Sequence, residues 1–186
     1  MTKRDRPSFA WLERILIGAG AWCLMWVGLG SLEAASFRRR LIETALPPAS
    51  EPAPAVPSAF VGRLEIPRLS FSELVAEGDD AGVLQAAIGH LPETALPWTP
   101  GNVVLAGHRD SVFRPLRGIR AGDELRLNTF QRTYRYRVSN LWIVDPDDVW
   151  VMAPTDNRSL TLVTCYPFTF IGRAPQRFVV RASATD

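Results

Sequence analysis

Residues 159–168 read Ser159-Leu160-Thr161-Leu162-Val163-Thr164-Cys165-Tyr166-Pro167-Phe168. This mixture of β-branched and apolar residues predicts a short strand that Pro167 stops. The strand ends near Cys165, and the only other cysteine of the 186 residues, Cys23, lies in a long apolar segment. If this part of the chain lies outside the cytoplasm, Cys165 is a lone thiol in an oxidising compartment, which favours a nucleophile over a structural residue. The alternative is a small apolar residue packed in the core.

The N-terminal segment predicts a membrane anchor. Residues 1–14 carry charges of both signs, and residues 15–32 then run without any charge. As a helix, residues 15–32 span about 27 Å, which is close to the thickness of the hydrocarbon core of a bilayer. A cleaved signal peptide is the alternative, although the apolar run is long for one. Positive charges flank both ends of the run, so the charge rule alone does not set the orientation of the helix.

A proline-rich linker follows this anchor. Residues 44–58 contain five prolines and one charge, a composition that favours an extended polyproline II stalk of about 45 Å. We therefore expect a cytoplasmic N-terminus at 1–14, a single transmembrane helix at 15–32, an extracytoplasmic linker at 33–59 and a globular domain at 60–186.

The globular domain is dominated by strand signals. One short helix is expected at 83–88, after the polar pair Asp79-Asp80, and a bend is expected near Ser139-Asn140. Seven or eight short strands with brief helices predict an all-β fold, either a closed barrel or a sandwich. The expected strands are 60–66, 73–77, 103–106, 124–127, 133–144, 160–165 and 178–182.

The strand that ends near Cys165 is expected to pair with the next strand along the chain. A loop of about ten residues between them makes an antiparallel pair plausible, and this pairing brings Arg177 near the thiol. An arginine beside a thiol stabilises the thiolate or binds a substrate carbonyl oxygen. Arg173 and Arg181 are alternatives, because spacing alone does not exclude them.

The chain has two histidines, and His108 is the stronger candidate for acid–base chemistry. It follows the apolar residues 103–106 through Gly107, so it lies just beyond the end of a core strand, where functional side chains are often found. His90 follows the short predicted helix and is as readily explained as a structural residue.

Three patterns together resemble the sortase family, which comprises membrane-anchored cysteine transpeptidases. They are Thr161-Leu162-Val163-Thr164-Cys165, Gly107-His108-Arg109-Asp110, and the arginine at 177 on the following strand. Residues 95–125 and 144–155 are similar to class D or E enzymes, and most like class D of the proteobacterial type. The resemblance covers residues 60–183, with the histidine, cysteine and arginine in the order that the family shows.

The resemblance implies a fold and a set of roles. The fold is an all-β, eight-stranded sortase-type barrel with short helices, preceded by one transmembrane helix. Cys165 is then the nucleophile, His108 the general acid/base, and Arg177 the group that orients the substrate and stabilises the oxyanion. Thr164 is expected to offer its hydroxyl to the substrate, and Asp110 to orient the loop that carries His108.

The resemblance also implies partners and a location. The substrates are proteins with an LPxTG-like sorting signal, cleaved through a thioester acyl-enzyme and joined to an amine acceptor, either a cell-wall precursor or a protein lysine. The enzyme lies in the bacterial cytoplasmic membrane as a single-pass protein with an extracytoplasmic, periplasmic catalytic domain. A cysteine endopeptidase on the same fold, which cleaves without joining, and a non-enzymatic membrane-tethered β-domain are the alternatives.

Two further expectations concern what the chain does not bind, and a third concerns residues 91–95. A formal net charge of +2 is too small to indicate nucleic acid as a partner. No cofactor or metal site is expected, with calcium at the acidic residues 79–80 or 145–148 as the alternative. Residues 91–95 read Leu91-Pro92-Glu93-Thr94-Ala95, which looks like a sorting signal with alanine in place of glycine, and we interpret this sequence as a feature of the fold.

Overall fold

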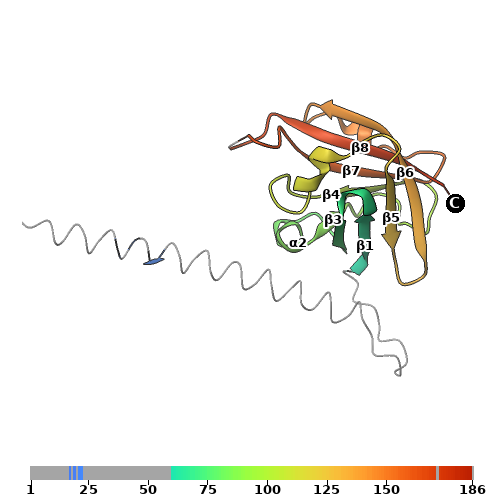
Figure 1. The fold of residues 1–186 in the computed structure, drawn as a ribbon, viewed down its shortest axis with the longest axis horizontal. Coiled ribbons are helices and arrows are strands. Elements are labelled where there is room, and N and C mark those ends of the chain that lie inside the picture. The colour runs from blue at the N-terminus through green and yellow to red at the C-terminus, as the bar shows by residue number, and fades with distance from the viewer. Residues whose placement is uncertain (1–16, 18, 20, 23–59, 171, 186) are drawn as a thin grey trace, which may run out of the picture.

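The computed structural model describes residues 17, 19, 21, 22, 60–170 and 172–185 (Figure 1). The predicted cytoplasmic segment at 1–14, the linker at 33–59 and most of the predicted transmembrane helix at 15–32 lie outside the described residues. Residues 17, 19, 21 and 22 are helical. Within the described part of the chain, no helix is both long and apolar enough to cross a membrane.

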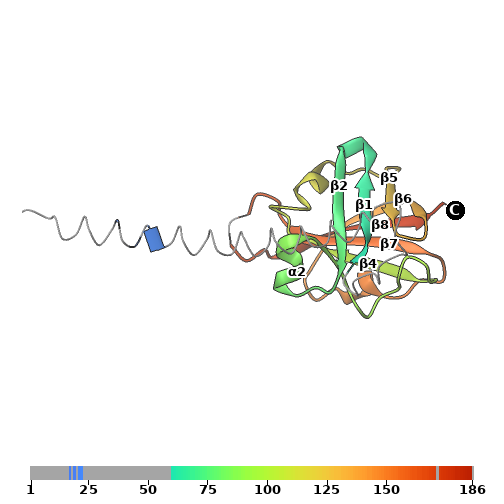
Figure 2. The same cartoon turned by 90° about the horizontal axis from the view of Figure 1, so that it is seen from below.

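The globular domain is a closed barrel of eight strands, which decides between the barrel and the sandwich. Around the barrel the strands follow the order β1-β2-β3-β4-β7-β8-β6-β5, and β1 closes it by pairing with both β2 and β5 (Figures 1 and 2). The strands are β1 (Phe60–Ile66), β2 (Phe71–Glu77), β3 (Ile88–His90), β4 (Asn102–Ala106), β5 (Glu124–Asn128), β6 (Thr133–Val144), β7 (Ser159–Tyr166) and β8 (Gln176–Ala184).

Two parallel pairings make the topology non-local. β2 runs parallel to β3, and β4 runs parallel to β7 although more than fifty residues separate these two strands in the sequence. Parallel neighbours need a crossover connection, and the β4–β7 connection contains β5 and β6. The end of β4 therefore lies beside the end of β7, which positions the functional site described below.

The core fills the inside of the barrel with alternate side chains from each strand. On β7, Leu160 and Leu162 point inward and are fully buried, and on β8 the inward residues include Val180 and Ala182. Phe113, from the connection after β4, is buried in the same cluster. The core therefore ties the two strands of the expected hairpin to the segment that follows His108.

The helix predicted at 83–88 begins and ends two residues earlier than expected. The helix α2 spans Ala81–Ala86, because the carboxylate of Asp80 accepts hydrogen bonds from the amides of Gly82 and Val83 and caps its N-terminus. Ile88 belongs instead to β3, a three-residue strand that periodicity cannot detect. Three short 3-10 helices, η1 (Pro67–Leu69), η2 (Arg114–Gly118) and η3 (Val149–Met152), lie in the loops.

The bend predicted near Ser139-Asn140 is present as a break in the β6–β8 register between Val138 and Asn140. After this bulge the side chains of β6 change faces, as an extra residue in one strand requires. Val144 consequently lies outside the barrel, where it packs with Val151 from η3 and Val179 from β8. Trp142, Met152 and Val163 pack against these three residues and complete an outer apolar cluster.

Candidate functional site

Cys165 and Arg177 lie directly opposite each other on neighbouring antiparallel strands. The β7–β8 register pairs Thr164 with Phe178 and Cys165 with Arg177, so the predicted proximity of Arg177 to the thiol is confirmed. Because side chains alternate along a strand, Cys165 shares the outer face of the barrel with Thr161 and Val163. The thiol is free and partly exposed.

His108 reaches the same end of the sheet from β4. The parallel register pairs Ala106 with Val163, and His108 follows Ala106 by two residues, just as Cys165 follows Val163. The amide of Gly107 donates to the carbonyl of Val163, which extends the pairing beyond the strand. His108 is exposed, so its ring is open to a substrate.

Gly107 is required where the chain turns toward His108. A Cβ built on Gly107 would lie 2.7 Å from Cδ2 of Phe113 and 2.9 Å from Cγ1 of Val112. Phe113 is fully buried and its amide donates to the carbonyl of His108. Only glycine fits against this ring, so the packing of Phe113 sets the path of the backbone at His108.

Thr164 does not offer its hydroxyl to the pocket. Its side chain faces the interior, with 3% of the residue exposed, and its Oγ1 donates to the carbonyl of Gly107 at 2.7 Å. The geometry therefore differs from the predicted substrate contact. Thr164 instead ties the strand that carries Cys165 to the turn that carries His108.

A pocket of about 250 Å³ collects the predicted residues. His108 comes from the end of β4, Cys165 from β7 and Arg177 from β8, while the loop between β7 and β8 closes one side. Asp110 also lines the pocket and is exposed, as its predicted position in the His108 loop requires. The lining residues are His108, Arg109, Asp110, Cys165, Gly172, Arg173, Ala174 and Arg177.

The structure separates the three candidate arginines. Arg177 is partly buried, and its Nη1 donates to the carbonyls of Gln176 and Ala174 at 3.0 and 3.4 Å, which holds the guanidinium at the pocket. Arg173 lines the same pocket from the β7–β8 loop. Arg181 lies opposite Thr161, donates to the carbonyl of Val151, and has a pKa lowered by burial. Arg181 is therefore part of the outer packing and not of this pocket.

His90 has a structural position. It is fully buried, its Nδ1 lies 2.8 Å from Oε2 of Glu77, and its Nε2 lies 3.0 Å from the carbonyl of Ala95. The hydroxyl of Thr94 donates to the carbonyl of Leu91 and closes a turn. The residues that look like a sorting signal, 91–95, thus form a turn anchored on His90, which agrees with their interpretation as a feature of the fold.

An apolar cluster lies next to the thiol on the outer side of the barrel, under η3. Val163, two residues before Cys165, contacts the outer apolar cluster that contains Met152. Met152 and Val149 also line a hollow of about 560 Å³, whose opposite wall is formed by residues 91–94. Along β7, the thiol therefore has the outer apolar cluster in one direction and the β7–β8 loop with Arg173 in the other.

Two of the acidic residues that suggested calcium accept hydrogen bonds from backbone amides. Asp80 caps α2, and Oδ2 of Asp148 accepts from the amide of Asp145. Across the described ranges, no three side chains of histidine, cysteine, aspartate or glutamate gather in a group that could hold a metal ion.

Arg109 belongs to the pattern at residues 107–110, but the sequence alone assigned it no role. Its Nη2 donates to the carbonyls of Phe170 and Gly172 at 2.6 and 3.0 Å, so it fixes the β7–β8 loop to the turn that follows His108. The only signal was its position next to His108, because its partners lie more than sixty residues away.

Comparison with known proteins identifies the family. The sortase domain model matches residues 64–185. Sortase D of Bacillus subtilis (strain 168) is 38% identical over 120 residues, which cover 64% of this chain and 61% of the relative. The chain thus spans about three fifths of the length of that curated relative.

Solved structures of sortases also match this chain. The Sortase D5 transpeptidase of Clostridium perfringens matches with a TM-score of 0.62 and 29% identity, over 68% of this chain and 79% of that one. Sortase C1 from Streptococcus agalactiae matches with a TM-score of 0.63 and 30% identity, over 69% of each chain. With its matching domain, its eight-stranded barrel and its cysteine, histidine and arginine at one pocket, this chain belongs to the sortase family.

Proposed function

We propose that this chain is a sortase that cleaves a sorting signal through a thioester on Cys165 and joins the acyl part to an amine acceptor. One observation carries this proposal: Cys165 lies opposite Arg177 and lines one pocket with His108. These three side chains supply a nucleophile, a charge that stabilises an oxyanion, and a group that moves a proton.

In the first half of the reaction the Cys165 thiolate attacks a peptide carbonyl. The thiolate is the nucleophilic form of a cysteine, and the guanidinium of Arg177 comes from the residue opposite Cys165 on the neighbouring strand. The guanidinium then stabilises the oxyanion of the tetrahedral intermediate. As the C–N bond breaks, His108 gives its proton to the departing amine, and a thioester on Cys165 remains.

In the second half the acceptor amine attacks the thioester carbonyl. His108 takes the proton from the amine nitrogen, the C–S bond breaks, and the sulfur leaves as a thiolate. The product is an amide, and the enzyme returns to its starting state. Water attacking the same thioester gives hydrolysis. The rate of attack by the amine relative to that by water therefore decides between joining and cleavage.

The apolar outer surface is the best candidate for binding the acyl side of the peptide. Val163 is partly exposed on the same face as Cys165 and Arg177, and Met152, which packs against the same cluster, lines the hollow beside η3. Such a surface suits the leucine of an LPxTG-like signal, because burying one leucine side chain contributes about 1.5–3 kcal/mol. Asp110 in the pocket is proposed to orient His108.

The subclass and the location are proposed on separate grounds. The similarity to sortase D of Bacillus subtilis supports class D, whereas the proteobacterial type stays a prediction from the sequence. The uncharged run at 15–32 and the prolines of the linker support a single-pass anchor in the cytoplasmic membrane with the barrel on the outer, periplasmic side. Thiol chemistry of this kind needs no cofactor, and we propose none.

The test uses the full-length chain in detergent micelles. A library of LPxTG-type peptides is incubated with an amine acceptor, and the products are read by mass spectrometry. We expect a joined product that disappears in Cys165→Ala and falls by about 10²–10⁴-fold in His108→Ala. Iodoacetamide labelling of Cys165 in the His108 variant is the control that the pocket is intact.

The competing functions give different results in this assay. Cleavage that depends on Cys165 but forms no joined product at any acceptor concentration identifies an endopeptidase on the same fold. No turnover together with a Cys165 that iodoacetamide does not label would identify a non-enzymatic domain.

A further inference from the structure

The catalytic pocket is strongly cationic. Arg109, Arg173 and Arg177 all line its volume of about 250 Å³, together with His108. Asp110 is the single carboxylate among the lining residues. No ion pair is found for any of these three arginines within the described ranges, so their charges are not cancelled by neighbouring acids.

The three guanidiniums are not equally available. Arg177 donates to backbone carbonyls of its own strand region, and Arg109 donates to the carbonyls of Phe170 and Gly172. Arg173 is exposed, and across the described residues its side chain makes no hydrogen bond or ion pair. The proposed oxyanion stabilisation uses Arg177, which lies opposite Cys165. The proposed reaction therefore assigns no role to the charge of Arg173.

Along β7, the outer apolar cluster and Arg173 lie in opposite directions from the thiol. Along the outer face of β7, Val163 precedes Cys165 and contacts the outer apolar cluster, while the β7–β8 loop with Arg173 lies beyond Cys165. If the acyl part of the peptide binds on the apolar side, the departing and incoming amines occupy the other side. His108, which exchanges the proton with those amines, also lines that side of the pocket.

We propose that the amine acceptor of this chain carries a free carboxylate a few bonds from its nucleophilic nitrogen, and that Arg173 is the residue that selects it. This inference rests on the proposed transpeptidase. The guanidinium binds the carboxylate while the neutral amine attacks the thioester carbonyl; the new C–N bond forms, the C–S bond breaks, and the amine proton passes to His108.

This chemistry separates the two classes of acceptor that the family resemblance leaves open. A lysine within a protein has its own carboxyl group in a peptide bond, so it presents no free carboxylate near the amine. An amino-acid centre of a cell-wall precursor that keeps both a free amine and a free carboxylate has the required groups. The pocket therefore favours the wall-type amine.

The first test compares two acceptors that differ only in this carboxylate. Joining rates are measured with glycine and with glycinamide for the full-length enzyme, for Arg173→Gln and for Arg173→Lys. The glycine-to-glycinamide ratio is compared between variants, so that the different basicities of the two amines cancel. We expect Arg173→Gln to lower this ratio about 3-fold or more, as an exposed charge pair provides, and Arg173→Lys to restore most of it.

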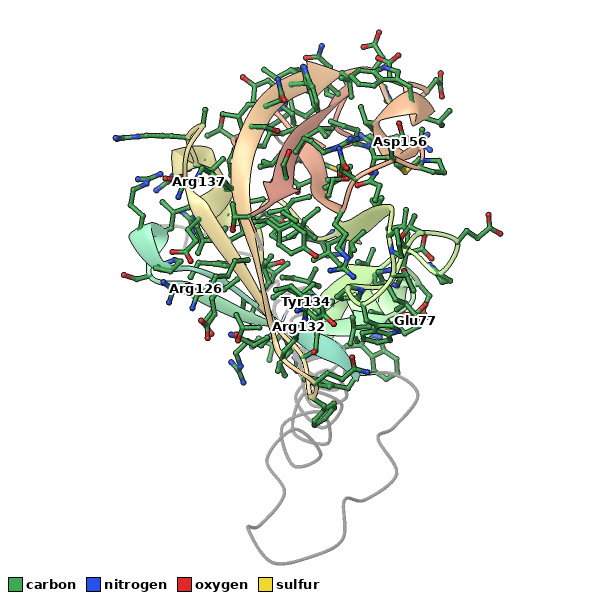
Figure 3. The ribbon with its side chains drawn as sticks, turned by 90° about the vertical axis from the view of Figure 1, so that its right-hand side faces the viewer. Glu77, Arg126, Arg132, Tyr134, Arg137 and Asp156 are labelled. Atoms are coloured by element: carbon green, nitrogen blue, oxygen red, sulfur yellow. The ribbon has the colours of Figure 1, made fainter. Side chains whose placement is uncertain are left out.

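The matched control is Arg137→Gln, which removes an exposed arginine on β6 outside the pocket (Figure 3). It keeps the wild-type ratio if the effect is local. A ratio that is the same in wild type and Arg173→Gln, or that falls equally in Arg137→Gln, overturns the assignment.

The second test needs no peptide substrate. Cys165 is alkylated with iodoacetate, which is an anion, and with iodoacetamide, which is neutral, and labelling at Cys165 is followed by peptide mass spectrometry. The pocket is expected to raise the iodoacetate-to-iodoacetamide rate ratio above that of a free cysteine. Arg173→Gln is expected to lower this ratio about 3-fold, and added salt is expected to weaken the preference for the anion.

The two tests separate the inference from the function on which it rests. A joined product with equal ratios in wild type and variant sinks the carboxylate assignment and leaves the transpeptidase standing. An anion preference in alkylation without any joined product from either amine overturns the transpeptidase, and with it the identity of the anion as an acceptor.

Discussion

At the scale of single residues, buried polar side chains decide where the exposed reactive ones lie. Thr164 is hidden inside the barrel, yet its hydroxyl binds the carbonyl of the residue before His108. His90 is fully buried, and both of its ring nitrogens lie within hydrogen-bonding distance of oxygen atoms. Neither residue lines the pocket of Cys165. Thr164 holds the turn that carries His108, and His90 holds the turn at residues 91–95.

Thr164→Val tests the link between the cysteine strand and the histidine turn. Valine keeps the shape but removes the donor to Gly107, so we expect a loss of about 1–3 kcal/mol in the free energy of unfolding. We also expect a lower kcat, because His108 is no longer held in register with Cys165. Urea unfolding and joining kinetics measure the two effects, and Thr164→Ser should recover both. Wild-type stability in the valine variant would contradict the importance of this hydrogen bond.

The two histidines are expected to respond in opposite ways. Replacing His90 by leucine leaves the carbonyl of Ala95 and the carboxylate of Glu77 without their partner, so the unfolding free energy should fall by about 1–3 kcal/mol. Replacing the exposed His108 by leucine should change stability by about 0.5 kcal/mol or less and abolish joining. Urea unfolding of both variants beside one activity assay makes the comparison, and a stable, inactive His90 variant would reverse our assignment.

At the scale of elements, the register between strands builds the site and the caps fix the loops beside it. The parallel β4–β7 pair aligns the ends of two strands, and the antiparallel β7–β8 pair then adds Arg177. The short helix α2 is followed by β3, which ends at His90. The turn after His90, residues 91–94, lines the hollow beside η3. A change at the N-terminus of α2 is therefore expected to affect the turn at residues 91–94, which does not line the pocket of Cys165.

Asp80→Ala tests the N-terminal cap of α2. Its carboxylate accepts from the amides of Gly82 and Val83 at 2.8 and 3.1 Å, and losing a cap of this kind costs about 1 kcal/mol. Hydrogen exchange should become faster across α2, and the urea midpoint should fall. Asp79→Ala is the matched control, because Asp79 is exposed and adjacent but does not cap the helix. Equal effects of the two variants would show that the cap is not the cause.

At the scale of the whole molecule, ion pairs join parts of the chain that are distant in sequence. Arg68 binds the carboxylate of Asp123 with two nitrogens and donates to the carbonyl of Gly118, so η1, η2 and the start of β5 are held together. Glu124 on β5 pairs with Arg135 on β6, and also with Arg126 on its own strand. Arg126 lies on one side of the barrel, and Asp156, on the β6–β7 loop, lies on the other (Figure 3).

These pairs predict how stability depends on pH. Hydrogen bonds from Arg68 lower the pKa of Asp123, and hydrogen bonds from Arg126 and Arg135 lower the pKa of Glu124 to about 2. A carboxyl group whose pKa is lower in the folded state stabilises the fold above its unfolded pKa and loses that contribution as the pH falls through the folded value. The thermal midpoint should therefore fall on acidification from about pH 4.5 to about pH 2.

Thermal unfolding of wild type and Asp123→Asn across this range is the measurement. The variant should start with a lower midpoint at pH 7 and lose less on acidification, because one of the two carboxylates is gone. Parallel curves for the two proteins would show that Asp123 does not contribute to the acid sensitivity.

The sequence by itself determined the elements and one contact of the site. Most strands were predicted within a few residues, because alternation and prolines act locally. The hairpin brought Arg177 near Cys165, and the strand register then selected Arg177 over Arg181 as the residue opposite the thiol. The end of an apolar strand likewise marked His108. The helix α2 was predicted two residues too late and the three-residue strand β3 was missed, since a side-chain cap and a very short pairing leave no periodic signal.

Only the tertiary structure decided the closure of the barrel and the composition of the pocket. Closure depends on β1 pairing with β5, and the position of His108 depends on β4 running parallel to β7. The inward hydroxyl of Thr164 and the hold of Arg109 on the β7–β8 loop follow from these pairings. Contacts of this kind join residues more than fifty positions apart, and local periodicity carries no information about them because it reports only how neighbouring side chains alternate.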